Sequence, residues 1–352
     1  MFNKFYKGKR VLITGSSGFK GSWLAIWLKH LGAEVAGYSL PPVTDMDNFI
    51  ICGVSKMINQ KNDNIKDLAS LKSFIQKFEP EIVFHLAAQP LVMESYANPV
   101  ENFATNVMGT VNLMEAIRHT ASVNVCINVT TDKVYKNDES IWGFRENDEL
   151  AGKDPYSASK SCSEIITSSY NYAFLKEKGV KVATARAGNV IGGGDWAENR
   201  IVPDFFRAVQ NGNDLVIRNP RATRPWQHVL ESLSGYLTLA KALHEDEKFA
   251  GAWNFGPNNN YEAYSVGELI GEFQKFFPAV SVKKPEIQQT QKEAHLLKLD
   301  ISKAVTYLNW NPILSFEQTV SFTQKGYMAD ISGDKIIKNR LAQIESFMNL
   351  AK

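Results

Sequence analysis

The chain has 352 residues, enough for one large or two modest domains, and its 44% hydrophobic and 22% charged content is typical of a globular protein that buries a core. A formal net charge of +2 provides no field that would attract nucleic acid or an anionic membrane. Three scattered cysteines argue against a disulfide framework or a metal site, and no apolar stretch approaches the length of a membrane span. We therefore expect a cytoplasmic protein without a metal, a nucleic-acid partner or a membrane partner.

A strand, a glycine turn and a helix follow one another directly in residues 11–31. The apolar run at residues 11–13, VLI, predicts a buried parallel strand, and Gly15, Gly18 and Gly21 come after it at three-residue spacing. Glycine lets the backbone turn tightly and approach a pyrophosphate, and the start of the helix offers unpaired N–H groups. The segment predicts a dinucleotide phosphate site; the alternative is a glycine-rich turn that binds nothing.

Strand and helix signals then alternate through the first half of the chain. Strands are predicted at 34–38, 81–86, 123–129 and 181–185, and helices at 65–78, 103–119 and 154–175. This alternation is the signature of a doubly wound α/β fold with a parallel Rossmann sheet. We therefore expect an NAD-binding Rossmann domain at residues 1–187.

The composition changes after residue 187, where prolines, arginines and tryptophans replace the regular rhythm. We expect a smaller, mixed α/β substrate domain at residues 188–352, with a helix at 229–243 that returns to the first domain. The tail at 336–352 is predicted to be an exposed amphipathic helix.

The tip of the second predicted strand indicates which dinucleotide is bound. An acidic residue there commonly holds the ribose hydroxyls of NAD, and an arginine would suit the 2′-phosphate of NADP. This chain has Ser39-Leu40-Pro41-Pro42, with neither an acid nor an arginine. The pattern favours NAD over NADP.

Two further features flank the predicted cofactor site. The small residues Ala87 and Ala88 follow a predicted strand, so the backbone there can pass close to a flat ligand such as the nicotinamide ribose. Asn106 is polar among apolar neighbours in a predicted helix. A solvated helix face and a hydrogen bond to a neighbouring strand both remain open for Asn106.

Tyr156 and Lys160, in the sequence YSASK, lie on one face of the helix that begins at Asp154-Pro155. A tyrosine is a poor base because its reference pKa is about 10, and a lysine ammonium one turn away favours the phenolate and lowers that pKa. The same lysine can hold the nicotinamide ribose. Such a pair suits removal of a proton from an alcohol while a hydride leaves its carbon, with general base catalysis worth roughly 10²–10⁴-fold.

Four polar residues, Thr130-Thr131-Asp132-Lys133, follow the strand predicted at 123–129. Ligands of open α/β sheets bind beyond the carboxyl ends of the strands, so these side chains are expected to face cofactor and substrate. A surface ion pair between Asp132 and Lys133 is the alternative.

A set of motifs spread over residues 10–310 resembles one family. They are GFKGSW, NVMGT, TTDKVY, RAGNVIGGGDW, RNPRATRPWQHV, WNFGP and KEAHLLKLD. The chain resembles the nucleotide-sugar 4,6-dehydratases of the extended short-chain dehydrogenase/reductase superfamily. The resemblance implies an NAD-dependent lyase that converts a nucleotide-glucose, with CDP-glucose favoured, to a 4-keto-6-deoxy sugar nucleotide for surface polysaccharide such as the O-antigen of lipopolysaccharide.

The resemblance also implies roles for five catalytic residues. Tyr156, helped by Thr131 and Lys160, would deprotonate the C4 hydroxyl while C4 gives its hydride to NAD. The 4-ketone acidifies the C5 proton, and Asp132 and Lys133 lie where that proton and the C6 hydroxyl leave. A glutamate takes the place of Lys133 in dTDP-glucose relatives, and a lysine can serve as C5 base only if burial or a neighbouring cation lowers its pKa. The hydride then returns to C6.

The remaining ligand assignments follow from the same motifs. Cofactor contacts are expected at Gly15, Ser17, Gly18, Phe19, Gly21, Ser39, Asn64, Ile65, Leu86, Ala87, Ala88, Asn106, Tyr156 and Lys160. Substrate contacts are expected at Gln89, Asn189, Arg218, Arg224, His228 and His295. Arg224 matches the family arginine that grips the nucleotide pyrophosphate, for which a planar guanidinium with bidentate reach is suited.

Four positions in three stretches depart from the pattern of the closest relatives. Ser16-Ser17 replaces His-Thr, Asn64 replaces the aspartate that receives the adenine amine, and Met93 replaces an arginine near the substrate. Asp63 is the alternative adenine ligand if the loop is shifted by one residue. The changes at Ser16 and Asn64 predict weaker NAD binding than in relatives with the aspartate, and Met93 leaves the sugar nucleotide open.

Other functions remain in competition with CDP-glucose dehydration. They are 4,6-dehydration of another nucleotide-sugar, epimerisation on the same fold, and NAD sensing without catalysis. Asp132 and Lys133 favour a dehydratase over an epimerase, and Tyr156 with Lys160 argues against a non-catalytic binder. The helices near 102–118 and 157–175 are expected to pair across a homodimer or homotetramer.

Overall fold

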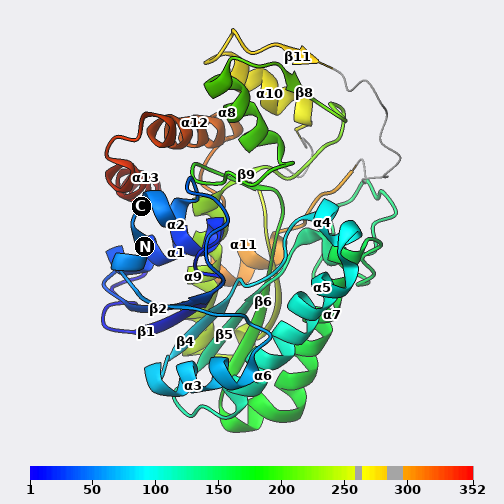
Figure 1. Ribbon diagram of the computed structural model, residues 1–352. Helices are drawn as coiled ribbons and strands as arrows, with labels where there is room; N and C mark the ends of the chain where they lie inside the picture. Colours follow the sequence, from blue (N-terminus) through cyan, green and yellow to red (C-terminus); the bar gives the residue numbers. More distant parts are fainter. Residues whose placement is uncertain (258–263, 284–295, 352) are drawn as a thin grey trace.

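The computed structural model describes residues 1–257, 264–283 and 296–351. Its larger part is built on a sheet of seven parallel strands in the order β10-β6-β5-β4-β1-β2-β3 (Figure 1). The strands are β1 (Arg10–Thr14), β2 (Glu34–Ser39), β3 (Asn59–Asn62), β4 (Ile82–His85), β5 (Val125–Val129), β6 (Lys181–Ala187) and β10 (Gly251–Phe255). This order confirms the predicted Rossmann sheet, and it places the topological switch point between β1 and β4.

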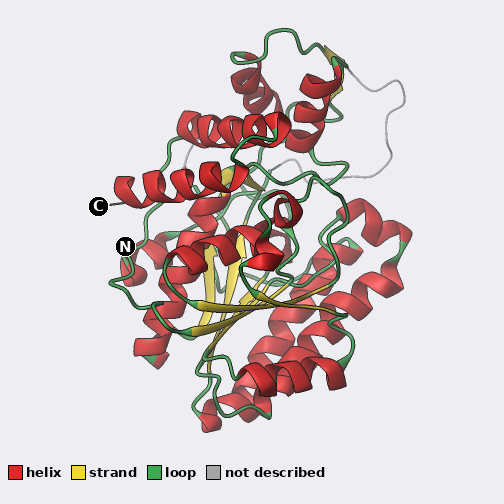
Figure 2. Ribbon diagram, turned by 60° about the vertical axis from the view of Figure 1, so that its left-hand side comes forward, coloured by secondary structure: helices red, strands yellow, loops and turns green. Residues whose placement is uncertain are grey.

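Helices cover both faces of the sheet (Figure 2). They include α1 (Phe19–His30), α3 (Leu68–Phe78), α6 (Gly109–Arg118), α7 (Pro155–Tyr170) and α9 (Val229–Glu245). Because successive strand residues point to opposite faces, Val11 and Ile13 join the core with α1 and α9, whereas Leu12 joins the core with α3 and α6. The strands are therefore buried on both faces, as their continuous apolar runs predict.

The helix predicted at 103–119 is divided into three pieces. The α-helix α5 (Pro99–Phe103) passes into a π-helical turn at Ala104–Met108 before α6 begins at Gly109. Single π-turns inside helices occur frequently at functional sites. This one contains Asn106, whose contacts are described below.

The smaller part lies beyond the carboxyl ends of the strands, at the top of Figure 1. It contains α8 (Ile201–Asn211), β8 (Leu215–Val216), α10 (Val266–Gln274), β11 (Val282–Lys283) and α12 (Phe316–Ser332). Its separate core is rich in aromatic rings, with Phe206 stacked on Tyr327 and Phe205 on Phe273. Two short strands, β7 (Val190–Ile191) and β9 (Gln227–His228), pair between the two parts.

The predicted boundary at residue 187 does not follow the sheet. The helix α9 packs on β5 and β6, but β10 also pairs with β6, and α11 (Ser302–Leu308) packs on β10. The sheet therefore draws several segments beyond residue 187 into the larger part. These long-range pairings leave no mark in the local sequence pattern.

The prediction of an exposed C-terminal helix is wrong for one face of α13 (Ile336–Leu350). This helix packs on α1 and α12, and the Arg340 side chain is fully buried in an ion pair with Asp330. Arg340 also donates to Asn48 Oδ1, and Asp330 accepts from the backbone N–H of Gly194. The helix thus connects the C-terminal segment to both parts of the molecule.

Candidate active site

The candidate site begins where β1 and β4 end side by side. The Thr14 hydroxyl bonds to His85 Nδ1 at 2.6 Å, and Thr14 Oγ1 accepts from the backbone N–H of Ala87 at 3.3 Å. The Gly15 N–H bonds to the carbonyl of Tyr38 on β2. The three strand ends are thus joined at the point where ligands bind in open α/β sheets.

The glycine turn leaves room that any other residue would fill. Gly15 has φ +74°, and a Cβ there would lie 2.6 Å from the backbone nitrogen of Ala87. A Cβ on Gly21 would lie 2.1 Å from the carbonyl oxygen of Gly15. Gly18 precedes α1 without a side-chain cap, so the first N–H groups of the helix remain available to an anion such as a diphosphate. The predicted residues Gly15, Gly18, Phe19 and Gly21 therefore fit a dinucleotide.

Neutral side chains form the tip of β2. Ser39 Oγ accepts from the Ser17 N–H and from Gln60 Nε2, and it lies 3.1 Å from Ser16 Oγ. Ser16 in turn donates to Gln60 Oε1 at 2.8 Å. The glutamine at position 60 was not among the predicted site residues, because it comes from the next strand and only the sheet register places it beside Ser39.

The loop after β3 holds both candidates for the adenine ligand. Asn64 Oδ1 accepts from the backbone N–H of Lys66, whereas Asp63 accepts from the Ser70 hydroxyl and from the Asn64 N–H. These bonds lower the pKa of Asp63, with the Ser70 hydroxyl as the largest cause. Ile65 is buried against Gly109 of α6. Both side chains are thus bonded within the loop, and Asn64 and Asp63 stay alternatives for the adenine contact.

Asn106 does not fit the prediction of a direct cofactor ligand. Its side chain accepts from the Gln89 N–H and donates to the Gln89 carbonyl and to Ser159 Oγ, and only 2% of the residue is exposed. Neither alternative for Asn106 holds as predicted, because the residue is buried and its hydrogen bonds reach the segment after β4 and α7 rather than a strand. Asn106 therefore positions the segment after β4, which contains Leu86, Ala87 and Ala88, against α7.

The helix α7 holds Tyr156 and Lys160 at the end of β5. Asp154 caps the helix by accepting from the Ser157 N–H, and Pro155 occupies its first position. Lys160 Nζ donates to the carbonyl of Val129, the last residue of β5, at 3.0 Å. Tyr156 and Lys160 are both buried, with 8% and 5% of their surface exposed.

The expected effect of Lys160 on Tyr156 is corrected by the structure. Burial raises the pKa of Tyr156 to about 12, and the groups that oppose this are the Thr131 hydroxyl and the Arg200 guanidinium. Burial also lowers the pKa of Lys160 to about 8, while Glu164 acts in the opposite direction. Helical spacing places both residues on α7, but it does not reveal the cost of burying them, and Lys160 is not among the groups that lower the pKa of Tyr156.

Asp132 is a buried acid rather than part of a surface ion pair. It begins a short 3₁₀ turn, Asp132–Val134, and its Oδ1 accepts from the Thr131 hydroxyl at 3.0 Å. Its other oxygen, Oδ2, is buried without a hydrogen-bond partner among the described residues. Burial raises the pKa of Asp132, opposed by Lys133, Thr131, Arg224 and Lys20. A proton-donating acid is favoured by such surroundings.

Two cations at the site were missed by sequence reasoning. Arg200 pairs with Asp195 at 2.8 Å and lies close enough to Tyr156 for their charges to interact. Lys20, in the first turn of α1, interacts with Lys160, Arg200 and Asp132. The only signal for Lys20 was its place inside the motif GFKGSW, whereas Arg200 lies outside every motif.

The predicted substrate residues differ in placement. Arg224 is buried and acts on the charge of Asp132, Asn189 joins β7 to β9 through its carbonyl, and the exposed Arg218 donates to the carbonyl of Asn199. Of the two predicted substrate arginines, Arg224 is thus the one whose charge acts on a predicted catalytic residue.

The side chains of two other predicted substrate ligands form hydrogen bonds within the protein. His228 does not fit, because its ring is fully buried between Trp23 and Phe322 and its Nδ1 accepts from the Leu230 N–H at the start of α9. The Gln89 side chain bonds back to the backbone of Leu91. His295 lies outside the described residues.

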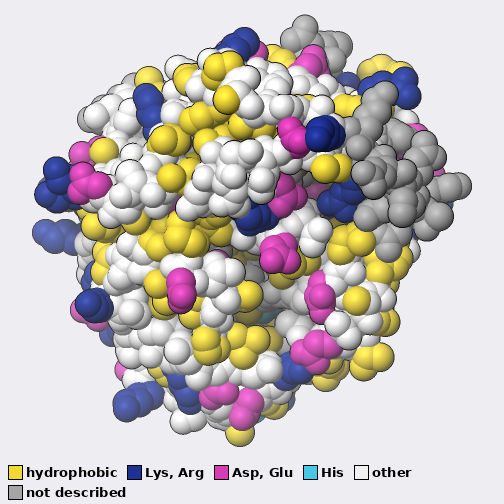
Figure 3. Space-filling model, turned by 45° about the horizontal axis from the view of Figure 1, so that its top comes forward, with side chains coloured by type: hydrophobic (Ala, Val, Ile, Leu, Met, Phe, Trp, Pro, Cys, Tyr) yellow, Lys and Arg dark blue, Asp and Glu magenta, His cyan; other side chains and the backbone are white. Residues whose placement is uncertain are grey.

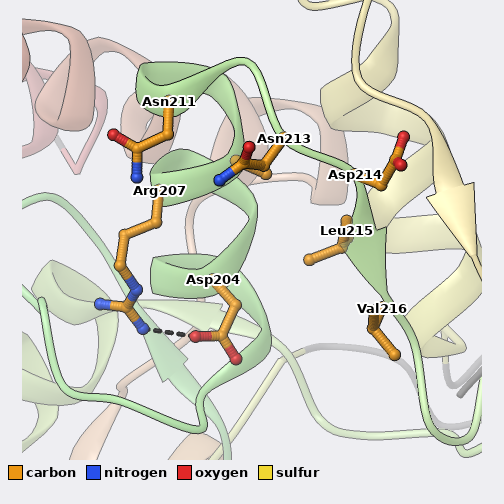
Figure 4. A pocket seen from close by; sticks show the side chains of 8 residues that line it. Asp204, Arg207, Asn211, Asn213, Asp214, Leu215 and Val216 are labelled. Atoms are coloured by element: carbon orange, nitrogen blue, oxygen red, sulfur yellow. Dashed lines mark hydrogen bonds and ion pairs between the residues drawn. The ribbon is translucent and has the colours of Figure 1, made fainter.

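The molecular surface is hollowed on one face and also has a small cavity. On the face drawn in Figure 3, basic and acidic side chains mix around a central hollow. A cavity of about 320 Å³ lies elsewhere, between α8 and β8, and the ion pair Arg207–Asp204 crosses its lining (Figure 4). None of the predicted catalytic residues lines this cavity. Within the described ranges, no cluster of metal-ligating side chains occurs, and no helix is long and apolar enough to cross a membrane.

Comparison with known sequences identifies the family. The family model described as GDP-mannose 4,6 dehydratase matches residues 12–323. The chain belongs to this family. A CDP-glucose 4,6-dehydratase from Salmonella typhimurium is 42% identical over 351 residues, which cover 98% of both chains. A dTDP-glucose 4,6-dehydratase of Xanthomonas campestris is 26% identical, over 91% of this chain and 93% of its own.

Solved structures share the fold of this family member. An epimerase of Methanothermobacter thermautotrophicus, Mth375, superposes with a TM-score of 0.79 at 24% identity, over 95% of this chain and 96% of its own. DesIV of Streptomyces venezuelae, a dTDP-glucose 4,6-dehydratase solved with NAD, gives 0.76 at 23% identity, over 90% and 97%. At these identities the likeness concerns the fold alone, because the fold serves both epimerases and dehydratases.

Proposed function

We propose that this protein is an NAD-dependent 4,6-dehydratase that converts CDP-glucose to CDP-4-keto-6-deoxyglucose. The observation that carries the proposal is the buried Asp132 next to the Thr131 hydroxyl and the Tyr156 phenol at the end of β5. An epimerase on this fold needs the tyrosine and the lysine only, whereas loss of water also needs an acid for the leaving hydroxyl. The Salmonella typhimurium relative supports CDP-glucose as the substrate.

The catalytic residues divide the work between C4 and C6 of the sugar. Bound NAD supplies the hydride acceptor and donor that a redox-neutral dehydration needs. Tyr156 receives the proton of the C4 hydroxyl, and the Thr131 hydroxyl and Arg200 stabilise the phenolate. Lys160, one helical turn after Tyr156 in the chain, is held by the Val129 carbonyl and is available to the nicotinamide ribose.

Asp132 acts at the other end of the reaction as the acid for the C6 hydroxyl. Burial keeps its carboxyl protonated to a higher pH than in water, and the bare Oδ2 is the atom free to hold the transferable proton. Arg224 lies close enough to Asp132 to bring a substrate diphosphate to the same place. The arrangement therefore supports proton donation to a departing hydroxide rather than return of a hydride to C4.

A panel of nucleotide-glucoses tests the assignment. The purified protein is incubated with CDP-, UDP-, dTDP- and GDP-glucose without added reductant, and the 4-keto product is measured by its absorbance in alkali and by mass. CDP-glucose should lose one water. Turnover of another nucleotide-sugar alone would show that CDP is wrong, with Met93 the first position to change, and interconversion without loss of water would identify an epimerase.

Assembly and location are further parts of the proposal. Exposed apolar side chains gather on α5, the π-helical turn and α7, at Val100, Phe103, Met108 and Ile165. These elements contact one another, so the side chains offer a face to a second copy of the chain. We expect a cytoplasmic homodimer or homotetramer that serves surface polysaccharide synthesis. Sedimentation of the wild type and of Val100→Glu measures the assembly, and a monomeric wild type would contradict it.

A further inference from the structure

Three side chains form a closed ring of hydrogen bonds at the tip of β2. Gln60 Nε2 donates to Ser39 Oγ at 3.0 Å, and the Ser16 hydroxyl donates to Gln60 Oε1 at 2.8 Å. Ser16 Oγ and Ser39 Oγ lie 3.1 Å apart. Because the Ser16 proton is already given to Gln60, Ser39 is the donor of this third bond. The ring therefore joins the glycine turn, β2 and β3 at one end of the predicted dinucleotide site.

A glycine on β2 makes room for this ring. Gly37 is the register partner of Gln60, and a Cβ at position 37 would lie 2.1 Å from Gln60 Oε1 and 2.4 Å from Ser16 Oγ. Real Cβ atoms do not approach other atoms so closely, so any other residue at position 37 would displace the glutamine. The Gln60 side chain can therefore cross β2 from β3 and reach the glycine turn.

The neighbours of the Gln60 amide determine which way it points. Its Nε2 lies 3.2 Å from the carbonyl oxygen of Lys61 and 3.0 Å from Asn62 Oδ1. A backbone carbonyl only accepts, so the amide nitrogen faces it and Oε1 faces Ser16. Among the described residues, the Ser16 hydroxyl is the one donor to Oε1. An amide oxygen accepts two hydrogen bonds, so one lone pair of Oε1 remains for a ligand.

Ser39, at the tip of β2, has no such capacity left. Its Oγ accepts from the Ser17 N–H and from Gln60 Nε2, which together use both lone pairs. Ser16 and Ser39 are also buried, whereas Gln60 is partly exposed. A ligand hydroxyl that donates a hydrogen bond at this tip therefore finds its acceptor on Gln60.

We propose that Gln60 is the specificity-determining residue of the cofactor site and that its amide oxygen accepts the 2′-hydroxyl of the adenosine ribose. An acidic residue at the tip of the second strand commonly accepts this hydroxyl, and Ser39 stands there in this chain. The glutamine supplies the missing acceptor from the neighbouring strand. This inference rests on the NAD dependence of the proposed function and assigns the residue that recognises NAD.

The same ring discriminates against NADP without a carboxylate. A 2′-phosphate carries only acceptor oxygens and negative charge, so it has no proton to give to Gln60 Oε1 and is repelled by that oxygen. No cation belongs to the ring. Lys61, the next residue of β3, donates to Ser70 Oγ at 2.6 Å and pairs with Asp63 at 3.6 Å. Selectivity for NAD thus depends on the orientation of one neutral amide.

Binding of dinucleotides in the absence of sugar tests this assignment. The probes are NAD, 2′-deoxy-NAD and NADP, and calorimetry gives their dissociation constants for wild type, Gln60→Met and Gln60→Glu. Wild type should bind 2′-deoxy-NAD roughly 3- to 10-fold more weakly than NAD, as expected for the loss of one neutral hydrogen bond. Gln60→Met keeps the length of the side chain but has no amide, so it should bind the two equally.

Gln60→Glu tests selectivity in a variant that preserves the ring. A carboxylate accepts from both serine hydroxyls, and it should tighten NAD binding by roughly 3- to 30-fold while it weakens NADP binding. Gln76→Glu is the matched control, because it makes the same change on α3, where the side chain donates to the carbonyl of His119. The control should leave the ratio of NAD affinity to NADP affinity unchanged. Thermal unfolding of each variant reports whether it is folded.

Three results would overturn the proposal. They are a wild type that does not distinguish NAD from 2′-deoxy-NAD, a folded Gln60→Met that still distinguishes them as wild type does, and a Gln60→Glu variant with the wild-type ratio of NAD to NADP affinity. The proposed function fails in a different way. A protein with all the expected dinucleotide affinities that dehydrates no nucleotide-glucose would support the assignment of Gln60 and overturn the proposed function.

Discussion

Two regions of this molecule bury charge in opposite ways. In the first region, where α7 packs on β6, Glu164 accepts from Arg186, Thr130 and Thr184, and both of its oxygens are satisfied. At the strand ends, Asp132 keeps one bare oxygen and Lys20 has no bonded partner among the described residues. Removing these charged groups from water costs free energy in both regions, but only in the first do internal hydrogen bonds offset that cost. The difference separates charges that hold the fold from charges left for a substrate.

The largest effect is expected when the buried ion pair between Arg186 and Glu164 is broken. Arg186→Met leaves Glu164 buried without its cation, which should cost about 3–5 kcal/mol in the free energy of unfolding. Urea unfolding of the variant measures this loss. The double variant Arg186→Met/Glu164→Gln should recover most of it, because no charge then remains buried. A single variant as stable as wild type would show that the pair does not hold the fold.

Tyr156→Phe probes the unpaired region. The variant should keep wild-type unfolding and NAD affinity but lose at least about 10²-fold in kcat, as expected when a general base is removed. Steady-state kinetics with CDP-glucose and NAD titration supply the two readouts. Near-normal turnover in this variant would remove Tyr156 from the mechanism.

The buried histidines predict how stability depends on pH. Burial lowers the pKa of His85 and of His228 to about 3, below the unfolded value of about 6.5. Below that unfolded pKa the unfolded chain binds protons that the folded chain does not, so stability is full above pH 6.5 and falls as the pH is lowered. Each histidine contributes up to about 1.4 kcal/mol per pH unit.

His228→Asn isolates one of these contributions. Asparagine keeps an acceptor for the Leu230 N–H and does not titrate, so the variant should lose about one proton from the slope of stability between pH 6.5 and 5. Unfolding in urea at several pH values gives the slope. An unchanged slope would mean that His228 is protonated in the folded protein.

The smallest expected effect concerns the adenine end of the cofactor. A hydrogen bond to a charged group is worth about 1.5–3 kcal/mol against about 1 for a neutral one, so Asn64→Asp should tighten NAD binding by several-fold. Added NAD should stimulate the wild type for the same reason. NAD affinity is measured for wild type, Asn64→Asp and Asp63→Ala. No gain in the first variant with a large loss in the second would identify Asp63 as the ligand.

Local pattern was sufficient for the strands, the glycine turn and the polar ends of β5, because buried parallel strands and tight turns restrict the residues that form them. It was insufficient wherever distant segments meet. Gln60 reaches Ser39 only through sheet register, and β10 joins the sheet from beyond the predicted boundary. Asn106 illustrates the same limit, since its partners lie in the segment after β4 and in α7.

The electrostatics of the site were the least predictable part. Helical spacing predicted that Lys160 would lower the pKa of Tyr156, but that pKa rises because burial outweighs the Thr131 hydroxyl and the Arg200 guanidinium. The local sequence does not predict where the Lys20 side chain lies, because a lysine in the first turn of a helix is usually exposed to solvent. The structure instead places its Nζ 5.8 Å from the centre of the Tyr236 ring, where α1 packs against α9.

Isotope transfer within one molecule tests the central claim most directly. CDP-glucose deuterated at C4 is converted in ordinary water, and again unlabelled substrate is converted in heavy water. Internal hydride return predicts that the C4 label appears at C6 of the product and that solvent deuterium appears at C5. A label that returns to C4, or that is lost to solvent, would contradict 4,6-dehydration at this site.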